Sequence, residues 1–228
     1  MENDLTAKVY GNIALVYSAQ RNYAKALEWN IKAIAILERV CGKEHLDTAC
    51  KYINIAGNYS GLGNTDKALE FYGKAVTINE NHGCYLNASG VYNIIASVYS
   101  DQGDYDKALD IYHNKVMVIF RQRLNKKHAA SATLCNNIAK VYARRGDNTQ
   151  ALEWFLRAYR ICLRKVGDPN LDTKRMASDT EHFLSDLRDA YHLAGMFESP
   201  GKKYCLVFDY WLQQNMRIID SIVEEFSP

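Results

Sequence analysis

The sequence has few helix-breaking residues and no long apolar run. Only 3 of its 228 residues are proline, and no segment reaches the ~18 apolar residues of a membrane-spanning helix. The first ten residues, MENDLTAKVY, lack the basic segment followed by an apolar one that marks a signal peptide. These absences predict a folded, helical, cytoplasmic chain with no membrane partner.

Motifs of catalysis and metal binding are also absent. The sequence has no G-x-x-x-x-G-K-[ST] motif, and the pair Gly61 and Gly63 reads as a turn at the end of a helix. Its 6 cysteines form no CxxC pair and its 6 histidines are scattered, which excludes metal-ligand spacing. We expect reduced, mostly buried thiols, no cofactor, no metal and no catalytic residue.

A pattern of aromatic and small residues recurs four times along the chain. Tyr-x-x-x-Ala-x-x-Tyr begins at Tyr10, Tyr52 and Tyr92, and the fourth copy begins at Cys135. An Ala-Leu pair follows each copy, at intervals of 42, 40 and 43 residues. Self-similarity at this period predicts stacked helix hairpins, whose alanines allow close crossing. The expected helices are 5–20, 23–40, 45–62, 66–81, 88–102, 105–123, 129–145 and 149–166.

These residues resemble the tetratricopeptide repeat, in the long form of about 42 residues seen in kinesin light chains. Gly42-Lys43-Glu44-His45, then Thr48-Ala49 and Asn54-Ile55-Ala56, carry the likeness to the long form. The resemblance implies an all-α, right-handed superhelical solenoid of antiparallel helix hairpins. We expect repeats at 5–44, 45–87, 88–127 and 128–168, and a degenerate fifth hairpin with a C-terminal capping helix at 169–228.

The last helix has a second interpretation. Instead of capping the stack, it could dock onto another subunit or domain, including a second copy of the chain. Trp211 and Phe226 favour that alternative if this end of the chain is exposed.

Small polar residues are expected on the concave face of the first helices, where a groove would form. Asparagine offers a donor and an acceptor, and in kinesin-light-chain-like repeats asparagines in this slot bind peptide backbone. Asn12, Asn54 and Asn137 match the slot, whereas the third repeat has Ile94 there. The alternative is that the asparagines only satisfy neighbouring helix carbonyls. The candidate peptide-binding residues are Asn12, Asn54, Ser60, Asn93, Ser97, Asn136, Asn137, Lys140 and Arg144.

The carboxylate clamp of chaperone-binding tetratricopeptide domains is not matched. It needs a basic residue and an asparagine one turn apart in the first repeat, where this chain has Gly11 and Leu15. A chaperone C-terminus is therefore not the expected ligand.

Charge is distributed unevenly. The net charge is +9 over residues 121–175 and −7 over the rest, within a total of +2. The basic residues form either a solvated face that pairs with acidic surfaces of a neighbouring molecule, or a binding site for an acidic peptide, protein or nucleic acid. The candidate basic patch comprises Arg121, Arg123, Lys126, Lys127, Arg157, Arg160 and Arg164.

The expected function is non-catalytic protein recognition. The first hypothesis is a scaffold or adaptor whose groove binds an extended, acidic peptide. The alternative is a regulatory or assembly subunit, or an arm of a larger protein, that acts through its basic convex face or last helix. Nucleic acid is a weaker candidate, because the chain is not basic overall and aromatic residues are not interleaved with the basic ones.

Overall fold

The protein is helical throughout the residues that the structure describes. The computed structural model describes residues 3–122 and 130–165. The all-α helical-repeat class is confirmed, while the handedness of the superhelix and the division into four repeats stay predictions. The proposed fifth hairpin and cap, 169–228, lie outside the described residues. The elements are α1 (Asp4–Ala19), α2 (Tyr23–Val40), α3 (Leu46–Gly61), α4 (Thr65–Asn81), α5 (Tyr85–Asp101), α6 (Tyr105–Ile111), the π-helical turn η1 (Tyr112–Val116), α7 (Met117–Gln122), α8 (Ala130–Arg145) and α9 (Asn148–Lys165).

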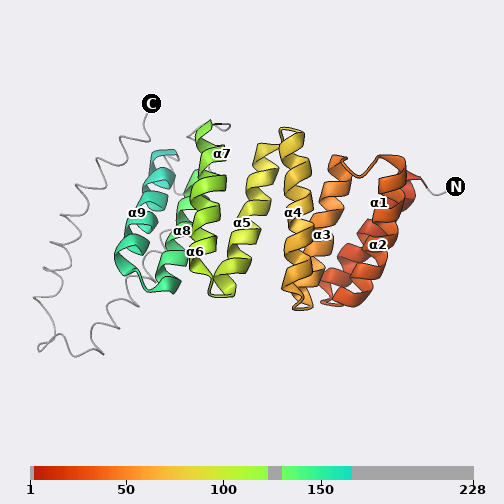
Figure 1. Cartoon of the computed structure of the whole chain (residues 1–228), viewed down its shortest axis with the longest axis horizontal. Helices are drawn as coiled ribbons and strands as arrows, with labels where there is room; N and C mark the ends of the chain where they lie inside the picture. The colour runs from red at the N-terminus through yellow and green to blue at the C-terminus, as the bar shows by residue number, and fades with distance from the viewer. Residues whose placement is uncertain (1–2, 123–129, 166–228) are drawn as a thin grey trace, which may run out of the picture. The chain divides into compact units, whose positions relative to one another are not determined.

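The helices fall into two compact units. Unit 1 comprises residues 1–101, with α1 to α5, and unit 2 comprises residues 102–228, with α6 to α9 as its described helices (Figure 1). In unit 1, α1 pairs with α2 and α3 pairs with α4 as helix hairpins, and α3 and α5 each pack on the preceding second helix.

Small side chains lie where the helices of a hairpin cross. Ala14, Ala26, Ala56 and Ala68 each have no exposed surface, as expected for residues that let two helix backbones approach closely. Aromatic rings fill the space beside these crossings; Phe71 lies 5.7 Å, centroid to centroid, from both Tyr52 and Tyr59. The repeated small and aromatic positions of the sequence therefore form the interior of unit 1.

The turn inside each hairpin needs a left-handed residue. Gly63, Gly103 and Gly146 occupy this position with φ of 76°, 81° and 88°, and glycine adopts such values without steric cost. In the first hairpin the position is held by Arg21, whose φ is 57°. The next amide, that of Asn22, donates to the Tyr17 carbonyl at 2.8 Å. This bond closes the helix end in the Schellman manner.

The second helix of each hairpin begins with an asparagine or aspartate cap. The side chains of Asn22, Asn64, Asp104 and Asp147 accept a hydrogen bond from the backbone N–H three residues later, at 3.1–3.3 Å. Such caps satisfy amides that the first turn of a helix leaves unpaired. The turn and the cap thus make every hairpin start its second helix in the same way.

A tyrosine–glutamate hydrogen bond joins successive hairpins of unit 1. The Tyr52 hydroxyl of α3 donates to Glu38 of α2 at 2.8 Å, and the Tyr92 hydroxyl of α5 donates to Glu80 of α4 at 3.0 Å. Burial, with the adjacent glutamate as the second cause, raises the pKa of both tyrosines to about 12. The bond is therefore a repeated joint between a second helix and the first helix that follows it.

We expect Tyr52→Phe to lower the free energy of unfolding by about 1–2 kcal/mol, because Glu38 loses its donor. The raised pKa gives a second signature. An unfolded tyrosine titrates near pH 10, so the stability from Tyr52 is present below pH 10 and is lost as the pH rises from 10 towards 12. Urea unfolding at pH 9 and pH 11 should therefore show a smaller alkaline loss in Tyr52→Phe than in wild type. Equal losses of stability in the variant and in wild type would contradict a stabilising hydrogen bond between Tyr52 and Glu38.

Unit 2 contains a π-helical turn that realigns its first long helix. The Met117 amide donates to the Tyr112 carbonyl, five residues back. In α2 and α4 the later buried residues lie 7, 8, 10 and 11 positions after Ala26 and Ala68. In unit 2 the corresponding buried residues lie 8, 9, 11 and 12 positions after Ala108. One extra residue is present, and the wider turn absorbs it so that the apolar face stays in register.

Most predicted helix boundaries agree with the structure to within one or two residues. The start of α5 differs more: the helix begins at Tyr85 and not at Ala88, because the Ala88 amide already donates to the Cys84 carbonyl at 3.0 Å. Only residues 82–84 separate α4 from α5. Of the gap between the expected helices 66–81 and 88–102, residues 85–87 are thus helical.

Candidate functional site

The candidate site is the exposed row of side chains on the first helices of unit 1. We call it the first-helix face. It is defined by Lys8, Asn12, Leu15 and Ala19 of α1, Cys50, Asn54, Gly57 and Gly61 of α3, and Gly90, Ile94, Ser97 and Asp101 of α5. These are equivalent positions of the three helices, offset by 42 and 40 residues. Each is exposed except Asn54, which is half-buried.

Two asparagines of this face have unused amides. Asn12 is exposed on α1 and Asn54 is half-buried on α3, and neither side chain forms a hydrogen bond within the described residues. The alternative interpretation required them to satisfy neighbouring helix carbonyls, and the structure does not support it at these two positions. Their helices lie side by side, because the Ser18 hydroxyl of α1 donates to the Asn58 side chain of α3 at 2.9 Å.

A tyrosine reaches this face from the second helix, and the sequence analysis missed it. The Tyr72 hydroxyl of α4 would lie 3.8 Å from a Cβ atom placed on Gly57, and within the described residues it has no hydrogen-bond partner. Burial raises the pKa of Tyr72. In the first hairpin the equivalent pair is Leu15 and Asn30. The first helix thus has the larger residue in the first hairpin, Leu15, and the second helix has it in the second hairpin, Tyr72. This exchange is the feature of the sequence that could have indicated the position of Tyr72.

A second glycine of the face makes room for an aromatic ring. A Cβ atom on Gly61 would lie 2.7 Å from two ring carbons of Tyr23, which begins α2. Because real contacts are not that short, any larger residue at Gly61 must displace the ring. The bare backbone of α3 at Gly61 therefore has a packing cause, whereas a Cβ atom on Gly57 would make only an ordinary van der Waals contact.

The other candidate peptide-binding residues differ in their exposure to solvent. Ser60 and Ser97 are exposed, and Asn93 is half-buried on α5. Asn136 of α8 is only 2% exposed. Our assignment of Asn136 to the groove is corrected on this ground, because its position on α8 faces the interior of unit 2.

Unit 2 presents the basic candidates on α8. Lys140 and Arg144 are exposed at the positions equivalent to Gly57 and Gly61, and Asn137 is half-buried at the position of Asn54. The neighbouring Arg145 pairs with Asp106 of α6 at 3.1 Å. The α8 counterpart of the first-helix face is therefore positively charged.

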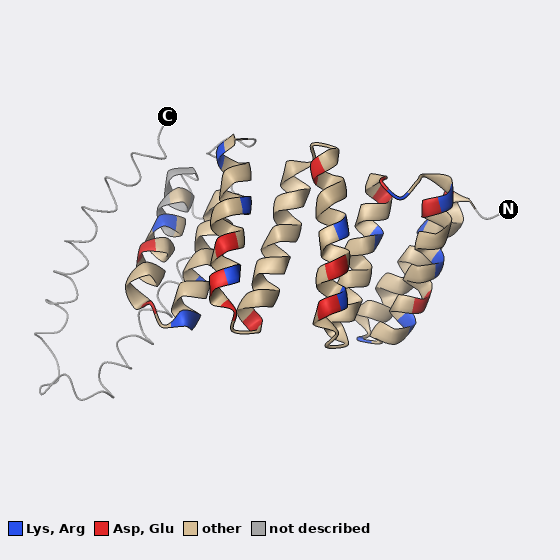
Figure 2. Ribbon diagram, viewed as in Figure 1, with Lys and Arg blue, Asp and Glu red and all other residues tan. Residues whose placement is uncertain are grey.

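Charge in unit 1 is concentrated on the second helices. Figure 2 shows α5 almost free of charged residues, with Asp101 at its end, whereas α4 carries several. Two of the α4 charges, Lys74 and Glu70, pair with each other at 2.6 Å. The first-helix face of unit 1 thus contains one cation, Lys8, and one anion, Asp101, and is nearly neutral.

Part of the predicted basic patch surrounds a histidine in unit 2. The ring of His113 of η1 lies 5.5 Å from that of Trp154 of α9, with the two planes tilted by 58°, and Arg157 lies 4.3 Å above the Trp154 ring. Burial, then Arg121 and Arg157, lowers the pKa of His113. The structure thus brings Arg121 and Arg157 near one imidazole. Arg123, Lys126, Lys127 and the side chains of Arg160 and Arg164 lie outside the described residues.

Other chemistry is limited in the described ranges. Among the described residues, no group of three or more His, Cys, Asp or Glu side chains could hold a metal ion. Of the helices searched there, none combines the length and apolarity needed to cross a membrane. Cys50 is exposed, and Cys41 and Cys84 are half-buried, so the expectation of buried thiols is wrong for Cys50.

Comparison with solved structures finds helical-repeat proteins. A putative kinesin light chain from Podosopora anserina with nearly identical TPR-like repeats is 16% identical over 98% of this chain and 99% of that chain, with a TM-score of 0.65. BtubC (BKLC) from P. vanneervenii is 19% identical over 87% and 84%, with a TM-score of 0.61. No curated protein matches the sequence. At these identities the likeness shows the fold.

A peptide-binding protein is among the similar structures. NprR, a quorum sensor from B. thuringiensis, is 19% identical over 78% of this chain and 48% of that chain in its apo form, with a TM-score of 0.59. NprR bound to its cognate peptide NprX matches with a TM-score of 0.52. The chain spans about half the length of NprR.

A family model adds the assignment that the structural likeness alone does not give. The model described as Tetratricopeptide repeat matches residues 5–81 and 87–164. These two ranges cover more than half of the chain and contain both the hairpins and the first-helix face. The protein therefore belongs to the tetratricopeptide repeat family.

Proposed function

We propose that this protein is a non-catalytic scaffold that binds an extended peptide across the first-helix face, with a preference for acidic sequences. The observation that carries the proposal is the pair of unused amides of Asn12 and Asn54 at equivalent positions of adjacent helices. An amide can donate to a peptide carbonyl and accept from a peptide N–H at the same time. Such pairing recognises backbone and leaves side chains to other contacts.

The spacing of helices fits an extended ligand. Neighbouring helices pack with axes about 8–10 Å apart, and an extended chain advances roughly 3.3 Å per residue. Asparagines on adjacent first helices would thus meet about every third peptide residue. The backbone of α3 is exposed at Gly57, and the Tyr72 hydroxyl lies close to this position. Both would offer the peptide a further polar contact beside Asn54.

The acidic preference rests on α8. In unit 2, taken by itself, Lys140 and Arg144 are exposed on this helix. An acidic segment would gain favourable electrostatics there and would approach faster at low salt. The peptide-bound NprR structure gives a precedent for peptide binding within a similar fold.

The test starts from peptides selected from a random library against the full 228-residue chain. Their affinities should fall at least about tenfold in the double variant Asn12→Leu, Asn54→Leu, because two buried backbone pairings of roughly 1 kcal/mol each are lost. The matched control is Asn81→Leu, which changes an exposed asparagine at the end of α4 and should leave affinity unchanged. Unfolding curves establish that all three proteins are folded.

Two results would contradict the proposal. The first is selected peptides that bind the double variant and wild type equally well. The second is enrichment of basic peptides, which would refute the acidic preference while leaving the backbone recognition in place.

A second function is favoured by the cluster around His113. Arg121 and Arg157 bring two positive charges close to His113 in unit 2, and such a basic cluster is suited to an acidic protein surface on a larger assembly. In that case binding of the native partner would survive the double asparagine variant and would be lost in Arg121→Ala, Arg157→Ala.

A further inference from the structure

Two apolar residues of α1 are exposed at positions whose counterparts on α8 are buried. Val9 and Val16 are 48% and 57% exposed. Their equivalents on α8, Leu134 and Val141, are 4% and 3% exposed, and Val91 of α5, equivalent to Val9, is 2% exposed. We call the side of α1 formed by Thr6, Val9, Tyr10, Ile13 and Val16 the open face.

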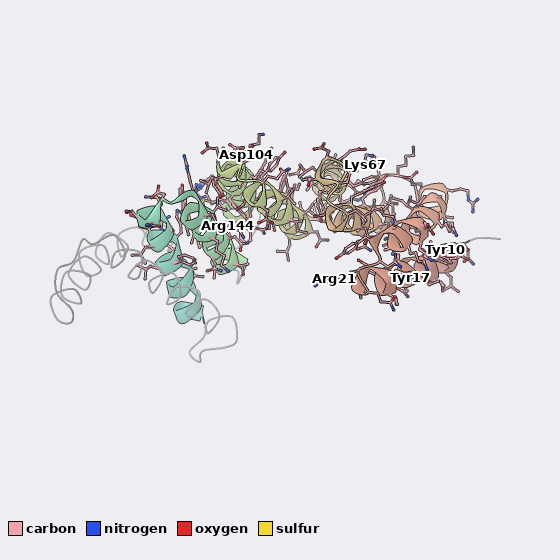
Figure 3. The ribbon with its side chains drawn as sticks, turned by 90° about the horizontal axis from the view of Figure 1, so that it is seen from below. Tyr10, Tyr17, Arg21, Lys67, Asp104 and Arg144 are labelled. Atoms are coloured by element: carbon pink, nitrogen blue, oxygen red, sulfur yellow. The ribbon has the colours of Figure 1, made fainter. Side chains whose placement is uncertain are left out.

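The equivalent face of the later helices is covered by the second helix of the hairpin before it. In unit 1, Leu27 and Ile34 of α2 pack in one cluster with Tyr52 and Ile55 of α3. Val76 of α4 packs in another cluster with Val91 of α5. Nothing within the described residues plays this part for α1, whose Tyr10 lies at the N-terminal end of unit 1 (Figure 3).

The open face also contains a tyrosine equivalent to those that join successive hairpins, but this tyrosine lacks the glutamate acceptor. Tyr52 and Tyr92 donate to Glu38 and Glu80 of the preceding helix. Tyr10 holds the same position on α1, where its ring lies 5.2 Å from the Trp29 ring and packs against the cluster of Ala7, Ile36 and Leu37. Within the described residues, the Tyr10 hydroxyl has no carboxylate partner.

We propose that the open face of α1 binds an amphipathic helix of a partner protein, packed as α2 packs on α3. This surface is distinct from the first-helix face, and the proposal does not depend on peptide binding there. The internal joints define the chemistry of the partner. Both α2 and α4 present an apolar residue, a second one seven positions later and a glutamate four positions after that: Leu27, Ile34 and Glu38, and Leu69, Val76 and Glu80.

A second copy of this chain fits the open face less well. Two open faces packed on each other would meet without an acidic residue, since none occurs among the five residues that define the face. The third joint also lacks the pair: Cys135 replaces the tyrosine, and Arg121 stands where the glutamate would be once the extra residue of the π turn is counted. Tyrosine and glutamate occur together or not at all, so Tyr10 indicates a glutamate-bearing partner.

The test uses a fluorescent peptide of residues 64–83 as the probe and the full chain as the receptor. A lactam bridge between its Glu70 and Lys74 side chains, which already pair in α4, holds the peptide helical, because a short free helix is marginal in water. Anisotropy should show saturable binding to wild type. Val16→Asp should weaken binding at least tenfold, and Ile31→Asp, a change at a 53% exposed residue of α2, should leave it unchanged.

The tyrosine–glutamate pair has its own readout. Glu80→Gln in the peptide and Tyr10→Phe in the protein should each weaken binding about fivefold to tenfold, and combining them should cause no further loss. The proposal is overturned if wild type does not bind the peptide, or if Val16→Asp binds it as tightly. It is also overturned if the chain forms a dimer that Val16→Asp dissociates and the peptide does not.

Discussion

Deleting Lys74 should unfold the second hairpin, whereas deleting Asn114 should leave the protein folded. Both residues are exposed, and each lies six positions after the buried alanine that begins the apolar face of its helix, Ala68 or Ala108. A change of one residue rotates everything after it by about 100° around the helix axis. The two deletions differ only in what that rotation does to the buried residues.

In α4 the register is regular, so deleting Lys74 turns Val76, Ile78 and Asn79 away from the interior. These residues are 5%, 3% and 3% exposed. Burying one Val or Ile side chain is worth about 1.5–3 kcal/mol, and a domain has only about 5–15 kcal/mol in total. We therefore expect the loss of cooperative unfolding for unit 1.

In η1 the deletion removes the extra residue. Val116, Met117, Ile119 and Phe120 then lie 7, 8, 10 and 11 positions after Ala108, as in α2 and α4. A regular α-helix can replace the π turn, and the loss is limited to the Asn114–Asp110 hydrogen bond and the placement of His113. Circular dichroism with urea unfolding should show a change of less than about 1.5 kcal/mol. Equal damage from the two deletions would refute this account of the π turn.

Enlarging Ala26 should destabilise the first hairpin strongly, while the same change at Ala24 should not. Ala26 has no exposed surface at the crossing of α1 and α2, whereas Ala24 is exposed two residues earlier in the same helix. Ala26→Leu must separate the helices or force strained rotamers, at a cost of about 1–3 kcal/mol or more.

Urea unfolding of Ala26→Leu and Ala24→Leu measures the difference directly. Leucine and alanine are both good helix formers, so propensity contributes little to it. If Ala26→Leu is as stable as Ala24→Leu, the small residues of the repeat do not set the helix spacing, and the explanation of the sequence pattern is wrong.

Much of the fold follows from the sequence because its determinants are local and repeated. The alanines, aromatics and capping residues recur at the same offsets, so each helix could be placed from the next copy. The π turn escaped the analysis because a single extra residue barely alters an apolar pattern. It becomes visible only when offsets from Ala68 and Ala108 are compared. The early start of α5 was missed because the residues around Gly83 are polar, and we placed the start of the next helix only at Ala88.

The site was less predictable than the fold. Spacing along a helix placed Asn12, Asn54, Ser60 and Ser97 at exposed or half-buried positions, but one step around the helix separates Asn137 from the buried Asn136. The Tyr72 hydroxyl reaches the face from another helix, which a pattern within first helices cannot reveal. The open face of α1 was hidden for a similar reason, since exposure of Val16 depends on which helix precedes it.

The most direct measurement of the central claim is an NMR titration of the full chain with a selected acidic peptide, observing the side-chain amides of Asn12 and Asn54. We predict that both resonances shift and saturate together with the binding curve, and that the Asn81 side chain stays unchanged. If the peptide binds while the Asn12 and Asn54 amides stay unperturbed, the first-helix face is not its binding site.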